Sequence, residues 1–250
     1  MSCLRLIERR RRCFVLLLYL LMHSISAQTS SAIQQTTNTF QSGGKKISVE
    51  IYKPATFGKP PAVLVLHGAG GIFMDGPAIR RFARVLAQNG LAAFVVHYFE
   101  RTGTVFARNA SIHKNFDVWR ETVNDAVDYM AAQPDVNPRA IGCFGYSLGG
   151  YLLLAQAAHD PRVKAVVELA GALDNEHAGL VKRLPPILIL HGEQDRRVPV
   201  ENAFRLEKIL QRLNVRYEMK IYRGEGHVLL GPSQLDAAMR AVHFLQQHLK

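Results

Sequence analysis

Apolar and polar positions alternate along most of the chain in blocks that are typical of buried strands followed by amphipathic helices. Apolar runs lie at 62–66, 91–99, 140–146, 163–169 and 187–190, and a further strand is expected at 216–222. Helical spacing is found at 78–89, 118–132, 148–158, 200–213 and 233–249. Continuous apolar strands that alternate with helices indicate a mostly parallel sheet covered on both faces. The pattern therefore predicts one α/β domain, with its active site at the carboxyl ends of the strands.

The edges of this pattern carry weaker signals. Residues 40–52 alternate around Gly43-Gly44, which predicts strands at an antiparallel edge of the sheet. Residues 28–39 are rich in Ser, Thr and Gln, so we expect a flexible tail before a domain at 40–250. Ser233 is the expected N-cap of the last helix, with Asp236 at its third position. After the strand at 91–99, an irregular stretch is expected up to about residue 115.

The first 27 residues have the pattern of a secretory signal peptide. Arg5 and the run at 9–12 are basic, residues 13–22 are almost all apolar, and Ala27 occupies a position that a signal peptidase can read. Spanning a bilayer takes about twenty apolar residues. We therefore expect cleavage before Gln28 and a secreted or periplasmic protein. A membrane-anchored protein with an uncleaved leader is the alternative.

Removal of this leader changes what charge and cysteine content imply. The formal net charge falls from +11 to +7, because the leader holds five Arg and one Glu. The remaining basic residues are scattered, so we expect no nucleic-acid partner. Cys3 and Cys13 leave with the leader, and Cys143 then has no internal disulfide partner. Since Cys143 lies in an apolar strand, we expect a buried structural thiol.

The segment Gly145-Tyr146-Ser147-Leu148-Gly149 lies where a predicted strand ends and a predicted helix begins. That context is what the Gly-x-Ser-x-Gly nucleophile elbow requires. The Ser147 hydroxyl would stand at the start of the helix, where the Leu148 N–H and the helix dipole can stabilise developing negative charge. The motif therefore predicts Ser147 as a nucleophile.

An acid and then a histidine should follow such a serine along the chain. Asp195 comes after the apolar strand at 187–190 and is the favoured acid, with Glu193 as the weaker alternative. His227 follows the last predicted strand in a glycine-containing turn, which distinguishes it from the other histidines. In this triad His227 would take the Ser147 proton and Asp195 would orient the imidazole.

A second oxyanion donor is expected from the loop after the first long parallel strand. His67-Gly68-Ala69-Gly70-Gly71 occupies that position, and we assign the Ala69 N–H, paired with that of Leu148, with Gly70 as the alternate. The segment lacks the spacing of a phosphate-binding loop. Because there is no His-Glu-x-x-His motif or Cys/His cluster either, we expect no metal or cofactor.

With these residues in place, the chain resembles the dienelactone hydrolase family of α/β-hydrolases over about residues 40–249. The resemblance rests on Gly145-Tyr146-Ser147-Leu148-Gly149-Gly150, His191-Gly192-x-x-Asp195-x-x-Val198-Pro199 and Gly226-His227. It implies the α/β-hydrolase fold without a large cap domain, and a hydrolase that acts on esters or lactones.

The resemblance also has departures. Dienelactone hydrolases proper look like Cys-dependent enzymes that carry an acidic residue beside the nucleophile, in the loop after the first long strand. This chain has Ser147 at the nucleophile position, and the position in that loop looks like Gly68. The segment from Tyr98 to Gly103 is similar to the family stretch whose Arg grips a substrate carboxylate. That similarity makes Arg101 a candidate substrate contact. Residues 228–230, which follow His227, are apolar and imply a less polar pocket wall.

The leading hypothesis is a carboxylic ester hydrolase with a small-molecule ester or lactone substrate. A peptidase or acyl-aminoacyl hydrolase is the alternative, because the same triad cleaves amides. A non-catalytic binding protein on this fold would be expected to have a broken triad, and here all three positions are filled. Loops at 100–117 and 172–184 are expected to form the pocket walls.

Overall fold

A computed structural model describes residues 32–55, 58–173, 179 and 181–250 of the chain. The predicted signal peptide lies outside these residues, as does most of the loop expected to form a pocket wall at 172–184. The residues from Ile33 to Lys250 form a unit that packs as one body.

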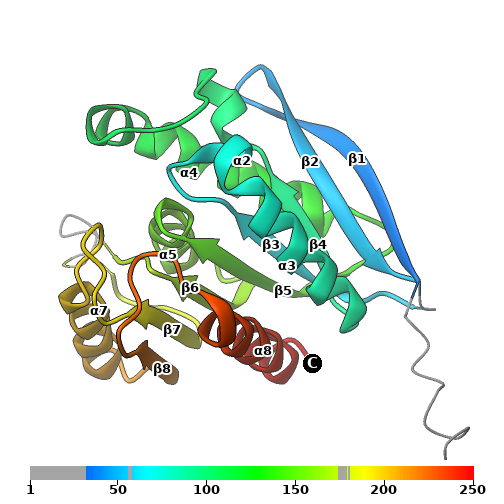
Figure 1. Ribbon diagram of the computed structural model, residues 1–250. Coiled ribbons are helices and arrows are strands. Elements are labelled where there is room, and N and C mark those ends of the chain that lie inside the picture. Colours follow the sequence, from blue (N-terminus) through cyan, green and yellow to red (C-terminus); the bar gives the residue numbers. More distant parts are fainter. Residues whose placement is uncertain (1–31, 56–57, 174–178, 180) are drawn as a thin grey trace, which may run out of the picture. The chain divides into compact units, whose positions relative to one another are not determined.

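Eight strands form a single sheet in this unit, in the order β1-β2-β4-β3-β5-β6-β7-β8 (Figure 1). The first two pairings along this order, β1 with β2 and β2 with β4, are antiparallel, and the other pairings are parallel. The mostly parallel sheet predicted from the alternating pattern is thereby confirmed. The strands are β1 (Ile33–Ser42), β2 (Lys45–Pro54), β3 (Pro61–Leu66), β4 (Ala92–Val96), β5 (Asn137–Tyr146), β6 (Val163–Leu169), β7 (Ile187–Gly192) and β8 (Tyr217–Tyr222).

Helices cover both faces of this sheet (Figure 1). One apolar core packs α4, α5 and α7 against one face, and a second core packs α3 and α8 against the other. Strands buried on both faces need apolar side chains at every position, which is why their sequences read as unbroken apolar runs. The helices are α2 (Gly71–Met74), α3 (Gly76–Gln88), the 3₁₀ helix η1 (Tyr98–Thr102), α4 (Asn109–Ala131), α5 (Leu148–His159), α7 (Glu201–Arg212) and α8 (Gly231–His248).

The prediction of a flexible tail at 28–39 is wrong for the residues of this range that the structure describes, because β1 begins at Ile33. This strand pairs along its whole length with β2, from Ile33 opposite Pro54 to Ser42 opposite Lys45. Most of its side chains are exposed, and Phe40 is one of the few that are buried. A solvated edge strand can be polar at almost every position, and its composition then resembles that of a tail.

Three element boundaries also differ from expectation. The strand expected at 91–99 ends at Val96, and η1 follows it. Helix α4 begins at Asn109, within the stretch expected to be irregular, because the Ser111 side chain satisfies backbone groups at its first turn. Helix α8 begins at Gly231, so Ser233 is not its N-cap. The Asp236 carboxylate instead accepts hydrogen bonds from Tyr222 and Arg240.

Candidate active site

Ser147 lies in the sharp turn between β5 and α5, at the carboxyl edge of the sheet. Its backbone has φ 52° and ψ −118°, a left-handed conformation that a side-chain-bearing residue rarely adopts. The surrounding hydrogen bonds hold this strained turn, since the Ser147 N–H donates to the Leu169 carbonyl and its own carbonyl accepts from Gly150. Strain of this kind persists only where the neighbouring structure imposes it, and it is concentrated at functional sites.

Two glycines allow the turn to close. A Cβ on Gly145 would lie 2.5 Å from the backbone of Gly149 and Gly150, and a Cβ on Gly149 would lie 2.8 Å from the His67 carbonyl oxygen. Both distances are far below van der Waals contact. The first turn of α5 therefore packs directly on β3 and β5, and this contact sets the position of the Ser147 hydroxyl.

Ser147, His227 and Asp195 form one hydrogen-bonded chain. The Ser147 hydroxyl donates to His227 Nε2 at 2.9 Å, and His227 Nδ1–H donates to Asp195 Oδ2 at 2.7 Å. Ser147 and Asp195 are buried, with 9% and 5% of their surfaces exposed. Glu193, the weaker acid candidate, points elsewhere and accepts the Gly224 N–H at 3.1 Å. The fold thus brings together three residues that are far apart in the sequence.

The loop after β7 holds the Asp195 carboxylate in place. Asp195 Oδ1 accepts the backbone N–H groups of Arg197 at 2.8 Å and Val198 at 2.9 Å. His191 Nε2–H donates to the Val198 carbonyl at 2.8 Å and lies 3.4 Å from Asp195 Oδ2. Burial lowers the pKa of His191, so its ring is neutral and serves to fix the loop.

The two assigned oxyanion donors line the same cavity as Ser147. Ala69 lies in the loop after β3, and Leu148 is the first residue of α5, where a backbone N–H has no partner within its own helix. The alternate, Gly70, is less suitable because its backbone N–H faces the Asp75 carboxylate. Ala69 and Leu148 therefore remain the candidate pair of oxyanion donors beside Ser147.

The buried rings of His67 and Tyr98 hold the start of the loop that contains Ala69. His67 Nδ1–H donates to the Gly68 carbonyl at 2.8 Å, and the Tyr98 hydroxyl donates to the His67 carbonyl at 3.0 Å. The two rings stack at 4.3 Å between centroids. Burial lowers the pKa of His67 to about 4, so this histidine remains neutral at ordinary pH and plays a structural part.

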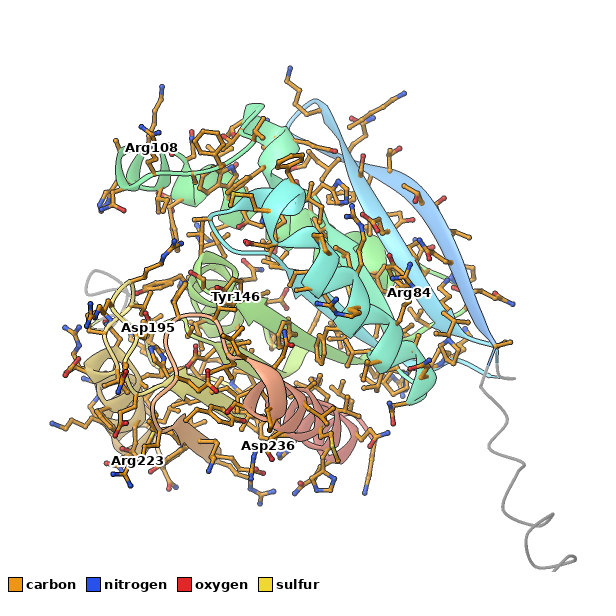
Figure 2. All side chains as sticks on the ribbon, viewed as in Figure 1. Arg84, Arg108, Tyr146, Asp195, Arg223 and Asp236 are labelled. Carbon is orange, nitrogen blue, oxygen red and sulfur yellow. The ribbon has the colours of Figure 1, made fainter. Side chains whose placement is uncertain are left out.

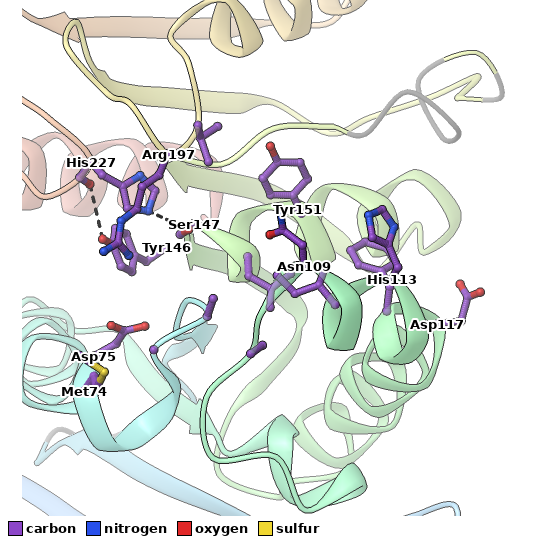
Figure 3. A pocket seen from close by; sticks show the side chains of 17 residues that line it. Met74, Asp75, Asn109, His113, Asp117, Tyr146, Ser147, Tyr151, Arg197 and His227 are labelled. Carbon is purple, nitrogen blue, oxygen red and sulfur yellow. Dashed lines mark hydrogen bonds between the residues drawn. The ribbon is translucent and has the colours of Figure 1, made fainter.

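A cavity of about 840 Å³ opens over Ser147 and His227 (Figure 3). Its far wall comes from residues 107–117, within the range 100–117 expected to form a wall, but most of these residues lie in the first turns of α4 and not in a loop. That wall combines apolar Ile112 and Phe116 with polar Asn109 and His113. The volume lies within the range of pockets that bind small molecules.

Arg101 lies outside this cavity, so the expectation that it contacts substrate is wrong. Its guanidinium donates to the Gly43 carbonyl at 2.7 Å and so binds the turn between β1 and β2. Arg197 is the arginine that lines the cavity, and its side chain lies beside His227 and Tyr146 (Figure 3). The sequence could have indicated Arg197 as a cavity residue, because Arg197 follows β7 at the carboxyl edge of the sheet and comes two residues after the predicted acid.

Asp75 is a second cavity residue that sequence reasoning missed. It precedes α3 without capping it through its side chain, and its carboxylate lies against the Gly68–Gly70 loop. A Cβ on Gly68 would meet both Asp75 Oδ2 at 3.0 Å and the Ser147 Cβ at 3.1 Å. The absence of a side chain at Gly68 thus leaves room for the Asp75 carboxylate near the nucleophile. Burial raises the pKa of Asp75.

Other candidate chemistries find no support in the described residues. No group of three or more His, Cys, Asp or Glu side chains is placed there to hold a metal ion. Cys143 is buried in β5, and burial raises the pKa of its thiol, as in a structural cysteine. No helix within the described ranges is long and apolar enough to cross a membrane. Charged side chains such as Arg84, Arg108, Arg223 and Asp236 are spread over different elements (Figure 2).

A mostly parallel eight-stranded sheet with this elbow and this hydrogen-bonded triad defines an α/β-hydrolase. A sequence model of the dienelactone hydrolase family matches residues 47–247. The chain therefore belongs to the dienelactone hydrolase family, as its motifs predicted.

Known proteins similar to the chain are consistent with this assignment. A Yersinia pestis protein with the provisional name carboxymethylenebutenolidase is 24% identical over 214 residues, which is 76% of each chain. The structure of a dienelactone hydrolase from Anabaena variabilis is 22% identical, with a TM-score of 0.70 over 87% of this chain and 99% of that one. A dienelactone hydrolase-like promiscuous phosphotriesterase from metagenomic libraries is 20% identical, with a TM-score of 0.78 over 88% of this chain and 100% of the other. At these identities the structural likeness supports the fold.

Proposed function

We propose that the protein hydrolyses carboxylic esters or lactones through an acyl-enzyme on Ser147. The observation that carries the proposal is the hydrogen-bonded chain from Ser147 through His227 to Asp195 at the floor of a small-molecule cavity. Family membership and the names of the relatives, which include a carboxymethylenebutenolidase and a dienelactone hydrolase, support this reaction class.

Acylation follows from the positions of the three side chains. Ser147 Oγ attacks the substrate carbonyl carbon while its proton moves to His227 Nε2, which accepts the hydrogen bond from the hydroxyl. The negative charge on the carbonyl oxygen then faces the N–H groups of Ala69 and Leu148. When the tetrahedral intermediate collapses, the bond to the leaving oxygen breaks and His227 returns the proton to that oxygen.

Deacylation repeats these steps with water. A water molecule loses a proton to His227 Nε2 as it attacks the acyl carbon, and the same two N–H groups meet the new oxyanion. Collapse breaks the bond to Ser147 Oγ, which regains the proton from His227, and the carboxylic acid leaves. Asp195 stays ionised and holds Nδ1–H throughout, so that Nε2 always faces the reacting groups.

Replacement of Ser147 tests the proposal. In Ser147→Ala, kcat for p-nitrophenyl acetate should fall by about 10⁶-fold, as when the nucleophile is removed from other triads. A fluorophosphonate probe should label the wild-type protein and not the variant. Ser233→Ala, a change on the surface of α8, serves as the matched control and should keep full activity and labelling. Unchanged turnover in Ser147→Ala would disprove the assignment.

A paired assay distinguishes ester hydrolysis from amide hydrolysis by the same triad. An ester and an anilide with the same acyl group present the same carbonyl, and they differ in the leaving group alone. An ester hydrolase should show a far higher kcat/KM on the ester. Comparable values on the two substrates would favour the peptidase alternative.

We also propose that residues 1–27 direct the protein out of the cytoplasm and are then removed. Support comes from the basic start followed by a short apolar run. The amino-terminal residue of protein recovered from outside the cytoplasm should be Gln28. A mature protein that keeps Met1 and sediments with membranes would favour the anchored alternative.

A further inference from the structure

A second cavity of about 410 Å³ lies between α3 and α8, on the opposite face of the sheet from α5. We call it the apolar groove. Its floor is formed where three neighbouring strands end, at Phe144, Leu169 and Leu190. Its walls are formed by Ile79, Phe82 and Val85 of α3 and by Leu229, Ala237 and Ala238 at α8.

The interior of the groove is almost entirely apolar. Leu190 is 0% exposed and Phe144 is 5% exposed, and the Phe82 ring packs on Phe144 at 4.2 Å between centroids. Among the lining residues, only Asp75 and Arg81 carry a charge. A polar ligand group on this floor would lose its water without gaining hydrogen bonds, which disfavours it. The floor therefore selects hydrocarbon.

The groove and the catalytic cavity share a wall. Met74, Asp75 and Tyr146 line both spaces. Tyr146 directly precedes Ser147 in the chain, and its ring lies 5.3 Å from the His227 ring between centroids. One layer of side chains thus separates the groove from the triad.

The rim of the groove extends its apolar surface. Val228, with 55% of its surface exposed, Leu235 with 64% and Met74 with 69% stand around the opening. Val228 and Leu229, which were expected together with Leu230 to form a less polar pocket wall, line this groove and not the cavity over Ser147.

We propose that the apolar groove binds an aliphatic arm of the ester substrate, so that the protein prefers esters with an extended hydrocarbon chain. This inference rests on the proposed function, because it needs a carbonyl at Ser147. An ester has two arms that diverge from its carbonyl, and the fold offers two spaces on either side of one shared wall beside the nucleophile, so the second arm would cross that wall at the exposed Met74. A protein partner is a poorer fit, since a stable interface buries about 800 Å² on each side, far more than a narrow cavity presents.

Two series of esters test the proposal. Straight-chain p-nitrophenyl esters from acetate to decanoate vary the acyl arm, and acetates of straight-chain alcohols vary the other arm. In one series, wild-type kcat/KM should rise about three- to fourfold for each added methylene until the groove is full, which corresponds to the transfer of one CH₂ from water. A flat dependence in both series would overturn the proposal.

Matched variants locate the effect in the groove. Ala238→Phe fills the groove from α8, and Ala78→Phe fills it from an exposed position on α3. Both variants should abolish the dependence of kcat/KM on chain length. Met239→Phe is the control, because Met239 adjoins Ala238 but is exposed and lies outside the groove. This variant should keep the wild-type dependence.

Further outcomes separate this inference from the proposed function and from other occupants. Suppose that Ser147→Ala abolishes acetate hydrolysis while both filled variants keep the wild-type dependence on chain length. The assignment of the triad would then stand, and the proposal that the groove binds an ester arm would be refuted. A wild-type dimer that dissociates in Ala238→Phe, with the dependence retained, would assign the groove to a second copy of the chain and refute an ester arm. Thermal melting of each variant checks that it is folded.

Discussion

At the scale of single residues, the site combines a strained nucleophile with a well-supported acid. Ser147 occupies a left-handed backbone conformation that the glycine contacts on both sides impose. Asp195 is the opposite case, because two backbone N–H groups and two histidines fix its carboxylate without strain. The geometry of His227 therefore depends on Asp195 more directly than on any other residue.

Asp195→Asn should lower kcat for p-nitrophenyl acetate by about 10⁴-fold, because an amide favours the wrong imidazole tautomer while the fold stays intact. Glu193→Gln is the matched control and should keep near wild-type activity, since Glu193 bonds to the Gly224 N–H and not to His227. Steady-state kinetics of both variants measure the effect. Equal losses in the two variants would show that the acid has been misassigned.

Glu168 provides a stability prediction that involves no catalytic group. Its side chain is fully buried in β6, and burial raises its pKa to about 8, although the Gly171 N–H donates to Oε2 at 2.7 Å. The unfolded chain loses this proton near pH 4.5, whereas the folded protein keeps it until about pH 8. The stabilising contribution is therefore complete below pH 4.5 and is lost as the pH rises to about 8.

The variant Glu168→Gln removes this titration and keeps the shape and the acceptor for Gly171. The melting temperature of the wild-type protein should fall relative to that of Glu168→Gln between pH 5 and pH 9. Thermal melts of both proteins across this range measure the difference. A difference that is constant with pH would contradict the assigned shift.

At the scale of elements, loops at the carboxyl edge of the parallel strands supply the triad, and the β1–β2 hairpin is fastened to the rest by charged contacts. The Glu50 carboxylate in β2 accepts hydrogen bonds from Arg80 of α3, from His97 and from Tyr52. Burial by itself would raise the pKa of Glu50, but these donors hold it well below its usual range. Arg101 adds a second fastening at the Gly43 turn.

Arg101→Ala should destabilise the protein by about 1–2 kcal/mol, because it removes a charged donor from the hairpin turn. Its kcat/KM on neutral and anionic esters should match that of the wild type, since Arg101 lies outside the cavity. Urea unfolding and kinetics measure the two quantities. Lys45→Ala, an exposed change in the same hairpin, is the control. A selective loss on anionic esters would restore Arg101 as a substrate contact.

At the scale of the whole molecule, the folded unit begins earlier than composition suggests. The edge strand β1 buries Phe40, which is 7% exposed, and Ser42 hydrogen-bonds to Thr122 of α4 at 3.2 Å. These contacts hold the end of β1 against the core, and the same strand pairs with β2 back to Ile33, through residues that the composition assigned to a tail. Residues 33–42 are therefore part of the folding unit.

A chain that lacks residues 1–27 should keep the wild-type melting temperature and the full activity. A chain that lacks residues 1–42 should lose roughly 3 kcal/mol or more, about what removal of one buried Phe costs, and it should expose the edge of β2. Urea unfolding of the two truncated proteins measures the difference. Equal stability of the two would show that β1 contributes nothing to the unit.

The sequence by itself determined the features that local physics controls. Apolar runs with helical spacing between them defined the strands, the helices and the parallel sheet, since strands buried on both faces need apolar side chains throughout. The elbow around Ser147 and the order of Asp195 and His227 were legible because each follows a strand end, and parallel strands end at one edge.

Only the tertiary structure decided features that depend on distant segments. It placed Arg101 on the Gly43 turn, brought Arg197 and Asp75 into the cavity, and moved Val228 to the apolar groove. Side-chain direction and the packing of α3 against α8 set these positions, and neither leaves a periodic trace in the sequence. The sequence predicted the antiparallel edge around Gly43-Gly44 but missed residues 33–39 of β1 for the same reason, since pairing with β2 and not apolar content makes them a strand.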